Sequence, residues 1–425
     1  MRHLVAEGGV YLKLTKVEKS WILYDVANSA FVLLIATTIP IYFRSLAEQS
    51  GADPAVATSL WGIATSISIA ILALLAPILG AIADYNGMKK RMFIISLALG
   101  AVGALSLGVI NDWFAYLLIF IMARIGYSAC NVFYDSMLTD VTTDDRMDYI
   151  SSSGYAWGYI GSCIPFILGI VLIFTKPFGM STTTATQISF IITALWWVGM
   201  SIPLLKNVKQ NYYLENRSDK ISHSFKRIGI TLKKITKDKK LLYFIIAYFF
   251  YIDGVYTIIS MATAYGGEVG IDSNSMILAL LLTQFVAFPF AILAGKLAGR
   301  FGALNLIRVF VLFYIAICIF GFQLDKQWEF WVLAVAVGLA QGGVQSLSRS
   351  YFGKLIPKEE SNEYFGFFDI FGKFADFLGP LLLAASGLIF GASKYGVLAL
   401  IILFVIGFIL LMRIPNQLDS AVSGE

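Results

Sequence analysis

Charged side chains stand inside several long apolar runs of this sequence. A charge at membrane depth is costly, so such a residue normally faces a water-filled cavity or a partner and marks a substrate or ion pathway. On this ground, and with two asparagines that share a helical face with these charges, the candidates for substrate binding or ion coupling are Asp25, Asn28, Arg124, Asn131, Asp135, Asp253, Asp369, Lys373 and Asp376.

Arg124 falls near the middle of its apolar run. Asn131 and Asp135 follow it by seven and eleven residues, so a helix would place all three on one face. A guanidinium at this depth suits an anionic group of a substrate, such as a carboxylate or a phosphate. The alternative is a buried ion pair that holds the first and fourth helices together.

Asp25 and Asp253 are carboxylates in the first and seventh runs. Asp25 lies within about two turns of the start of its run, with Asn28 on the same face. Its structural alternative is a carboxylate that rests on a helix N-terminus. Asp253 lies twelve residues into its run (253 − 241), where a lone carboxylate is a candidate proton carrier. The alternative for Asp253 is a pairing with Lys373.

Asp369, Lys373 and Asp376 are spaced i, i+4 and i+7, which places them on one helical face. Two acids around one base can hold their charges neutrally and release them when a ligand or a proton arrives. The alternative is a self-neutralised structural triad. Both histidines, His3 and His223, lie outside the apolar runs, so a proton relay within the membrane would have to use carboxylates.

The elements that must position these residues are membrane helices. Of the 425 residues, 58% are hydrophobic and 14% charged, whereas a soluble protein carries about 25% charged residues. A membrane-spanning helix needs about 20 mostly apolar residues. Twelve such runs lie near 21–43, 57–82, 92–110, 113–138, 150–174, 187–205, 241–263, 275–298, 303–323, 328–350, 364–390 and 395–413. We therefore expect an all-α membrane protein with twelve transmembrane helices.

The polar segment 206–240 separates two sets of six runs. We expect an N-terminal six-helix half at 1–205, a linker at 206–240 and a C-terminal six-helix half at 241–425. Lys and Arg residues concentrate in this linker and in one set of alternate loops, which predicts that both termini and the linker are cytoplasmic.

The linker also contains apolar residues at helical spacing, with lysines on other faces. This pattern predicts an amphipathic basic helix on the anionic inner leaflet, and the alternative is a solvated linker. The apolar residues are Ile221, Phe225, Ile228, Leu232 and Ile235.

An internal repeat relates the two halves. The segment from Gly80 to Gly87 has a counterpart from Gly295 to Gly302 at an offset of 215 residues (295 − 80 and 302 − 87). Pro165 and Pro380 are separated by the same offset (380 − 165). Two repeated six-helix halves around a central cavity are typical of secondary transporters.

The first copy of the repeat resembles the loop signature of the major facilitator superfamily. In that signature Tyr85 stands where a basic residue is usual, and in the second copy Arg300 keeps the base while Gly299 replaces the acid. The resemblance implies a latch, because the loop carboxylate can cap a neighbouring helix or pair with an arginine. The implied latch residues are Gly80, Asp84, Gly87, Lys89, Lys90 and Arg300, and we add Arg349 as an anchor or gate.

Longer strings narrow the resemblance to the vacuole-effluxer-like branch of that superfamily. They are Trp21–Phe31, Ser152–Gly161, Gly342–Ser350 and Phe365–Lys373. The resemblance implies the major facilitator fold, with two pseudo-symmetric halves. Together with the charges inside the runs, it leads us to expect alternating-access transport of a small polar or zwitterionic solute, coupled to protons. The resemblance alone suggests amino acids as one candidate class of solute.

Two other functions are kept as alternatives: an exporter or flippase of a lipid-like or drug-like amphiphile, and a non-transporting membrane receptor. An intramembrane enzyme would need a nucleophile with a base or a metal-ligand cluster at one depth, and the runs contain neither pattern. We expect no metal, no cofactor and no nucleic-acid partner. The expected partners are a solute, protons and the lipid bilayer, for a monomer in a bacterial cytoplasmic membrane.

Overall fold

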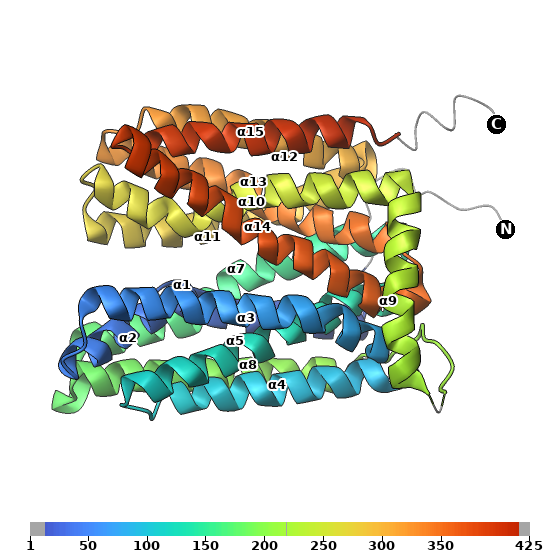
Figure 1. Cartoon of the computed structure of the whole chain (residues 1–425), viewed down its shortest axis with the longest axis horizontal. Coiled ribbons are helices and arrows are strands. Elements are labelled where there is room, and N and C mark those ends of the chain that lie inside the picture. Colours follow the sequence, from blue (N-terminus) through green and yellow to red (C-terminus); the bar gives the residue numbers. More distant parts are fainter. Residues whose placement is uncertain (1–12, 218, 416–425) are drawn as a thin grey trace.

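Long helices make up most of the structure, because backbone polar groups inside a bilayer must pair within their own segment. The computed structural model describes residues 13–217 and 219–415, without the side chains of residues 54, 55, 58, 273, 274, 374–377, 380 and 384. The long helices run along one axis (Figure 1). They are α1 (Lys16–Ala36), α3 (Pro54–Ala83), α4 (Met88–Leu107), α5 (Trp113–Ser136), α7 (Asp144–Thr175), α8 (Thr182–Asn207), α10 (Lys239–Glu268), α11 (Ser273–Phe301), α12 (Ala303–Phe322), α13 (Gln327–Leu355), α14 (Ser361–Phe390) and α15 (Lys394–Met412).

Shorter elements connect or flank these helices. They are α2 (Thr38–Gln49), α6 (Leu138–Val141), α9 (Lys220–Lys237) and the 3-10 turns η1 (Pro177–Gly179) and η2 (Lys358–Glu360). Within the described residues, eleven helical segments are long and apolar enough to cross a membrane, with α1 and α2 counted together. The remaining long helix, α14, has 30 residues, about 45 Å, and packs against α3 and α10. This order agrees with the predicted twelve-helix fold.

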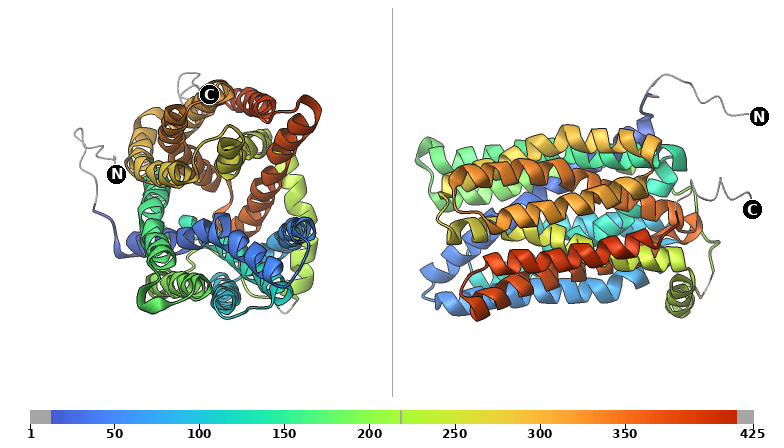
Figure 2. Two further views of the ribbon diagram at one scale, coloured as in Figure 1. Left: turned by 90° about the vertical axis from the view of Figure 1, so that its left-hand side faces the viewer. Right: turned by 90° about the horizontal axis from the view of Figure 1, so that it is seen from above.

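Two separate hydrophobic cores divide the helices. One core is built from residues of α1 to α8 and the other from residues of α9 to α15. Viewed from one end, α1–α8 and α10–α15 lie on opposite sides of the molecule (Figure 2, left). We call α1–α8 the N-terminal bundle and α10–α15 the C-terminal bundle. The domain boundaries at 205/206 and 240/241 remain a prediction.

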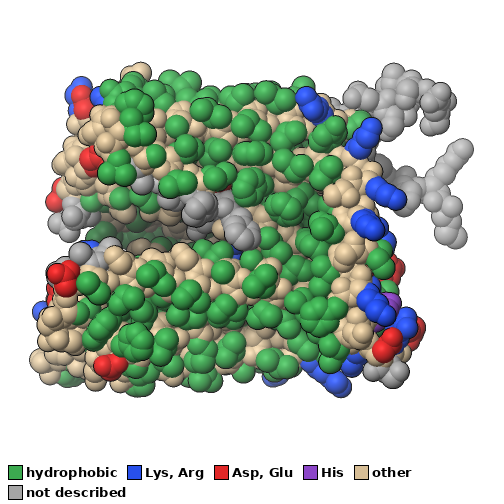
Figure 3. Space-filling model, in the orientation of Figure 1, with side chains coloured by type: hydrophobic (Ala, Val, Ile, Leu, Met, Phe, Trp, Pro, Cys, Tyr) green, Lys and Arg blue, Asp and Glu red, His purple; other side chains and the backbone are tan. Residues whose placement is uncertain are grey.

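The two ends of the molecule differ. Helix α9 lies crosswise over one end, where the chain also enters α1 and leaves α15 (Figure 1). Lys and Arg side chains gather at this end, which we call the basic end, and apolar side chains cover the sides (Figure 3). The opposite end, which we call the open end, is hollowed between the two bundles in the same view.

Glycines set the spacing of the helices within the N-terminal bundle. A Cβ added at Gly126 of α5 would lie 2.3 Å from the backbone nitrogen of Gly100 in α4. Backbone atoms cannot move aside as a flexible side chain can, so any side chain at Gly126 would force α4 and α5 apart. Small residues that allow such close approach are a common feature of membrane helix contacts.

We expect Gly126→Ala to destabilise the protein by about 1–3 kcal/mol, because the added methyl group overpacks the α4–α5 contact. Gly199→Ala in α8 is the matched control, since a Cβ at Gly199 meets no atom within 4 Å. Thermal unfolding of the purified variants in detergent measures the difference. Equal midpoints for the two variants would contradict the packing argument.

Candidate functional site

Arg349 of α13 is the most constrained cation at the contact between the two bundles. Its side chain is buried, with 3% of its surface exposed. Its Nη2 donates to Asp25 Oδ2 of α1 at 3.0 Å, and its Nη1 donates to Asp135 Oδ1 of α5 at 2.9 Å. Its Nε and Nη2 also donate to the hydroxyl and the backbone carbonyl of Ser151 in α7, at 3.0 Å each. Arg349, which belongs to the C-terminal bundle, therefore binds three helices of the N-terminal bundle.

Aromatic rings enclose the same guanidinium. Its central carbon lies 4.4 Å from the ring centre of Tyr155, 4.7 Å from that of Trp21 and 5.4 Å from that of Tyr134. Cation–π attraction is strongest at such desolvated sites. These rings also exclude water, which strengthens the ion pairs of Arg349.

Glycines of α7 leave space for the Asp25 carboxylate of α1. A Cβ added at Gly154 of α7 would lie 2.2 Å from Asp25 Oδ2, and one at Gly158 would lie 2.7 Å from the Ser29 hydroxyl. The glycines in the α7 string therefore allow α1 to approach α7 closely enough for Asp25 to reach Arg349.

A second group of contacts joins α7 to α13 on both sides of Arg349 along α13. Asp148 accepts a hydrogen bond from Ser350 at 2.7 Å and an ion pair from Lys354 at 2.6 Å. The hydroxyls of Ser152 and Ser346 are 2.8 Å apart. All three contacts cross from the N-terminal to the C-terminal bundle.

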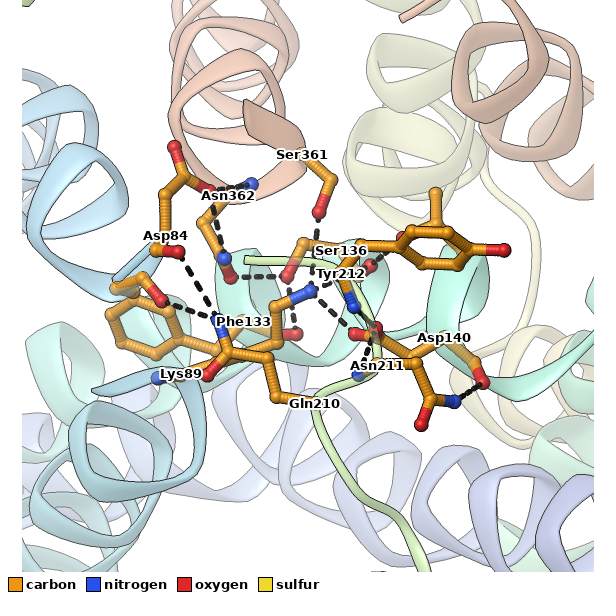
Figure 4. A network of polar contacts seen from close by, with 12 residues as sticks. Asp84, Lys89, Phe133, Ser136, Asp140, Gln210, Asn211, Tyr212, Ser361 and Asn362 are labelled. Atoms are coloured by element: carbon orange, nitrogen blue, oxygen red, sulfur yellow. Dashed lines mark hydrogen bonds and ion pairs between the residues drawn. The ribbon is translucent and has the colours of Figure 1, made fainter. Parts of the chain in front are cut away.

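A third group lies where α14 begins, and Figure 4 shows it at close range. Asp84, just after α3, accepts hydrogen bonds from the backbone and side-chain nitrogens of Asn362, both at 2.9 Å. A carboxylate at a helix N-terminus pairs with its unsatisfied amides and with the helix dipole. A Cβ at Gly80 would lie 2.4 Å from the Asn362 carbonyl oxygen, so this glycine permits the contact.

Lys89 of α4 lies in the same network. Its buried ammonium pairs with Asp140 of α6 at 2.6 Å and donates to Ser361 of α14 at 3.1 Å. Asp140 also accepts from the backbone nitrogens of Asn211 and Tyr212, at 2.7 and 3.0 Å, in the segment that leads to α9. The network therefore holds α14 and the linker against the N-terminal bundle.

Arg227 of α9 supplies a further cation to Asp84. Its Nη2 lies 3.1 Å from Asp84 Oδ2 and 2.5 Å from Glu363 Oε2 of α14. Burial raises the pKa of Asp84 to about 6, and the neighbouring Arg227 and Asn362 oppose this shift. One guanidinium thus binds a carboxylate from each bundle.

The other candidates lie deeper. Asn28 donates to Asn131 at 3.1 Å, which ties α1 to α5. The guanidinium of Arg124 lies 5.9 Å from the ring centre of Phe120. Lys373 pairs with Asp369 at 2.6 Å, and these two side chains are 21% and 18% exposed.

Asp253 of α10 is fully buried. Its Oδ1 accepts from the backbone nitrogen of Gly379 in α14 at 2.9 Å and from Thr257 at 3.4 Å. Asp253 therefore links α10 to the second half of α14. The side chain of Asp376 lies outside the described part of the structure.

The structure brings some of the predicted residues together across the bundles. Asp25, Asp135 and Arg349 form one ion cluster, and Asp84 and Lys89 belong to the network at the start of α14. The remaining latch candidates have local contacts: Lys90 donates to the Val208 carbonyl, Gly87 has a positive φ of 73°, and the exposed Arg300 lies over the ring of Phe301.

Sequence reasoning missed Arg227, Asp140, Asp148 and Glu363. A signal for Arg227 existed, because Ser224, Arg227, Thr231 and Ile235 recur at helical spacing and form the buried face of α9. That row contains two small hydroxyl residues, which suit a close contact with protein. No comparable spacing pattern in the sequence marks Asp140, Asp148 or Glu363.

Comparison with known proteins gives consistent results. The family described as "Vacuole effluxer Atg22 like" matches residues 15–419. The chain is 45% identical over 419 residues to the "Uncharacterized MFS-type transporter YxiO" of Bacillus subtilis, covering 97% of this chain and 98% of that one. It is 28% identical over 264 residues to Autophagy-related protein 22 of Yarrowia lipolytica, covering 55% and 44%. The solved structure of FucP, a major facilitator transporter in the outward conformation, superposes with a TM-score of 0.67 at 16% identity, covering 95% and 98%.

We expect Arg349→Gln to separate the bundles at the basic end. The substitution leaves the buried Asp25 and the partly exposed Asp135 without their cation. Removing one partner of a buried ion pair costs about 3–5 kcal/mol. This is more than a 100-fold change in the ratio of closed to open molecules, at about 1.4 kcal/mol per tenfold. Spin labels at exposed Asp145 and Glu359, in a background without the three native cysteines, should report longer distances by electron paramagnetic resonance.

The matched control is Arg300→Gln, which removes the same charge from an exposed site of the C-terminal bundle. We expect its distances to equal those of the parent. In Arg349→Lys the distances should stay nearly as long as in Arg349→Gln, because an ammonium cannot bind two carboxylates and a serine in one plane. An unchanged distance distribution for Arg349→Gln would contradict the expectation that Arg349 holds the two bundles together at the basic end.

Proposed function

The chain belongs to the family of vacuole effluxer Atg22-like proteins, within the major facilitator superfamily, and on that premise we propose that it carries a small polar or zwitterionic solute by alternating access. The chain is an integral membrane transporter and not an enzyme. Its solute, its coupling ion and its orientation in the membrane are parts of the proposal.

The observation that carries the proposal is the difference between the two ends. The polar contacts between the bundles described above cluster at the basic end, whereas the surface is hollowed between the bundles at the open end (Figure 3). A site between the bundles would be reached from one side at a time, as alternating access requires.

The charge distribution supports an orientation. Lys and Arg residues of membrane proteins are enriched on the cytoplasmic side, and here they gather at the end that α9 crosses. We place this end, with both termini, in the cytoplasm of a bacterial cell. The structure then corresponds to an outward-facing state, with the Arg349 cluster as its inner gate.

Groups of both signs support a zwitterionic solute. Arg124 on α5 suits a carboxylate, and the partly exposed pair Lys373–Asp369 on α14 can exchange partners with either charged group of a solute. Helices α5 and α14 pack against each other, so the two helices that carry these groups meet across the two bundles. Amino acids carry this combination of charges, and we propose them as the solute class.

The position of Asp253 supports proton coupling. Its carboxylate holds the backbone of Gly379 and is fully buried. A proton on Asp253 would weaken this contact between α10 and α14, the helix that also carries Lys373. We propose that Asp253 transmits protonation to the solute site through α14.

One cavity favours a second candidate function. It has a volume of about 110 Å³, lies within the C-terminal bundle and is lined mainly by apolar side chains, among them Ile259, Leu280 and Val337. Such a cavity would suit the apolar part of an amphiphile. Transport of a lipid-like or drug-like compound is therefore the alternative.

A ligand screen tests the solute class. A ligand that binds the folded state stabilises it by RT ln(1 + [L]/Kd), about 2.7 kcal/mol at 100 times Kd. We expect the unfolding temperature of the purified protein to rise with one or more amino acids and to stay unchanged with sugars and phosphate esters. Stabilisation by amphiphiles alone would favour the second candidate.

A substitution tests the coupling. In proteoliposomes with an imposed pH gradient, we expect Asp253→Asn to abolish proton-driven movement of the ligand found by the screen, because an amide cannot take up or release the proton. Exchange of ligand at equal pH should persist. The matched control, Asp272→Asn, makes the same chemical change at the exposed N-cap of α11 and should behave as the parent. Unchanged proton-driven transport by Asp253→Asn would refute the role of this residue.

A further inference from the structure

Helix α9 lies at the rim of the basic end. It appears at the front of the molecule in Figure 1 and at a corner of the view from above in Figure 2 (right). The sides of the molecule next to it are covered with apolar side chains (Figure 3). If these sides face lipid, α9 lies where the acyl chains meet the headgroups.

The protein holds α9 in this place from both bundles. Arg227 pairs with Asp84 and Glu363, and Lys234 pairs with Glu360 at 2.9 Å. His223 Nδ1 lies 2.7 Å from the Tyr85 hydroxyl. These contacts fix which side of α9 faces the protein.

The fixed contacts leave an apolar row exposed. Ile221, Phe225 and Leu232 are 59%, 55% and 47% exposed. Phe225 and Leu232 each follow a buried residue, Ser224 and Thr231, so they lie about 100° round the helix from the protein-facing side. Bulky side chains of this kind at the surface normally have a partner.

Lysines occupy the next sector of the helix. Lys226, Lys233 and Lys237 are exposed and lie about 100° further round from the apolar row. Round the circumference of α9, the side that contacts the protein is thus followed by the apolar row and then by the lysines. An apolar face beside a basic face is the pattern of helices that lie in the membrane interface.

We propose that this outer side of α9 binds anionic phospholipid, with Ile221, Phe225 and Leu232 among the upper acyl chains and the three lysines on the phosphates. Charge complementarity selects the headgroup, since juxtamembrane lysines are attracted to anionic leaflets. The rim position selects lipid as the partner, because a soluble protein would have to displace headgroups to reach the apolar row. This proposal does not depend on the identity of the solute.

The test uses the full-length protein in detergent, stripped of lipid and titrated with phosphatidylglycerol or phosphatidylcholine. Native mass spectrometry counts the retained lipids, and we expect more phosphatidylglycerol than phosphatidylcholine. The variant Lys226→Gln/Lys233→Gln/Lys237→Gln should weaken the phosphatidylglycerol binding by more than about tenfold, given the attraction of each lysine. These lysines are exposed, so the variant should fold as the parent does.

The matched control is Lys13→Gln/Lys16→Gln/Lys19→Gln, which removes three exposed charges elsewhere and should retain lipid as the parent does. Ile221→Ser/Phe225→Ser should weaken binding of both lipids. Equal losses in the two lysine variants, or equal retention of the two lipids by the parent, would overturn the proposal. So would a dimer of the parent that Ile221→Ser/Phe225→Ser converts to monomer, because α9 would then be an interface between copies of the chain.

Discussion

The burial of Arg349 at the contact between two bundles constrains the rest of the structure. A guanidinium away from water is tolerated when its donors are satisfied and carboxylates lie close to it. Asp25, Asp135 and Ser151 meet this demand from three helices of the opposite bundle. Their positions relative to α13 are therefore fixed to hydrogen-bond precision, and Gly154 is needed because any side chain there would displace Asp25.

Closure of the basic end is distributed over several layers of contacts. The Arg349 cluster, the Asp148–Lys354 pair and the network of Asp84 at the start of α14 all cross between the bundles. These contacts share the same rigid helices, so opening one layer displaces the others and their energies are not independent. Such an arrangement favours two discrete states over gradual opening, which is what alternating access needs.

The fold could be predicted from the sequence because lipid makes hydropathy a direct signal, and the apolar runs match the long helices to within several residues. The site could be predicted only in part. Periodicity placed Asp135 on the Arg124 face, but the two lie about 16 Å apart along α5, and Asp135 instead pairs with a residue 214 positions away. A one-dimensional pattern gives the depth and face of a residue. It does not tell which face of the other bundle will meet it.

Tyr85 shows how a departure from the family's loop signature is accommodated. A basic residue is usual at this position, yet here the side chain is buried and contacts His223 of α9. The neighbouring Asp84 instead pairs with a cation from α9, Arg227. The contacts of the loop thus extend to the linker helix. Since Arg227 also binds Glu363 of the other bundle, any separation of the two bundles at the basic end would have to break one of the two ion pairs of Arg227 or move α9 with one bundle.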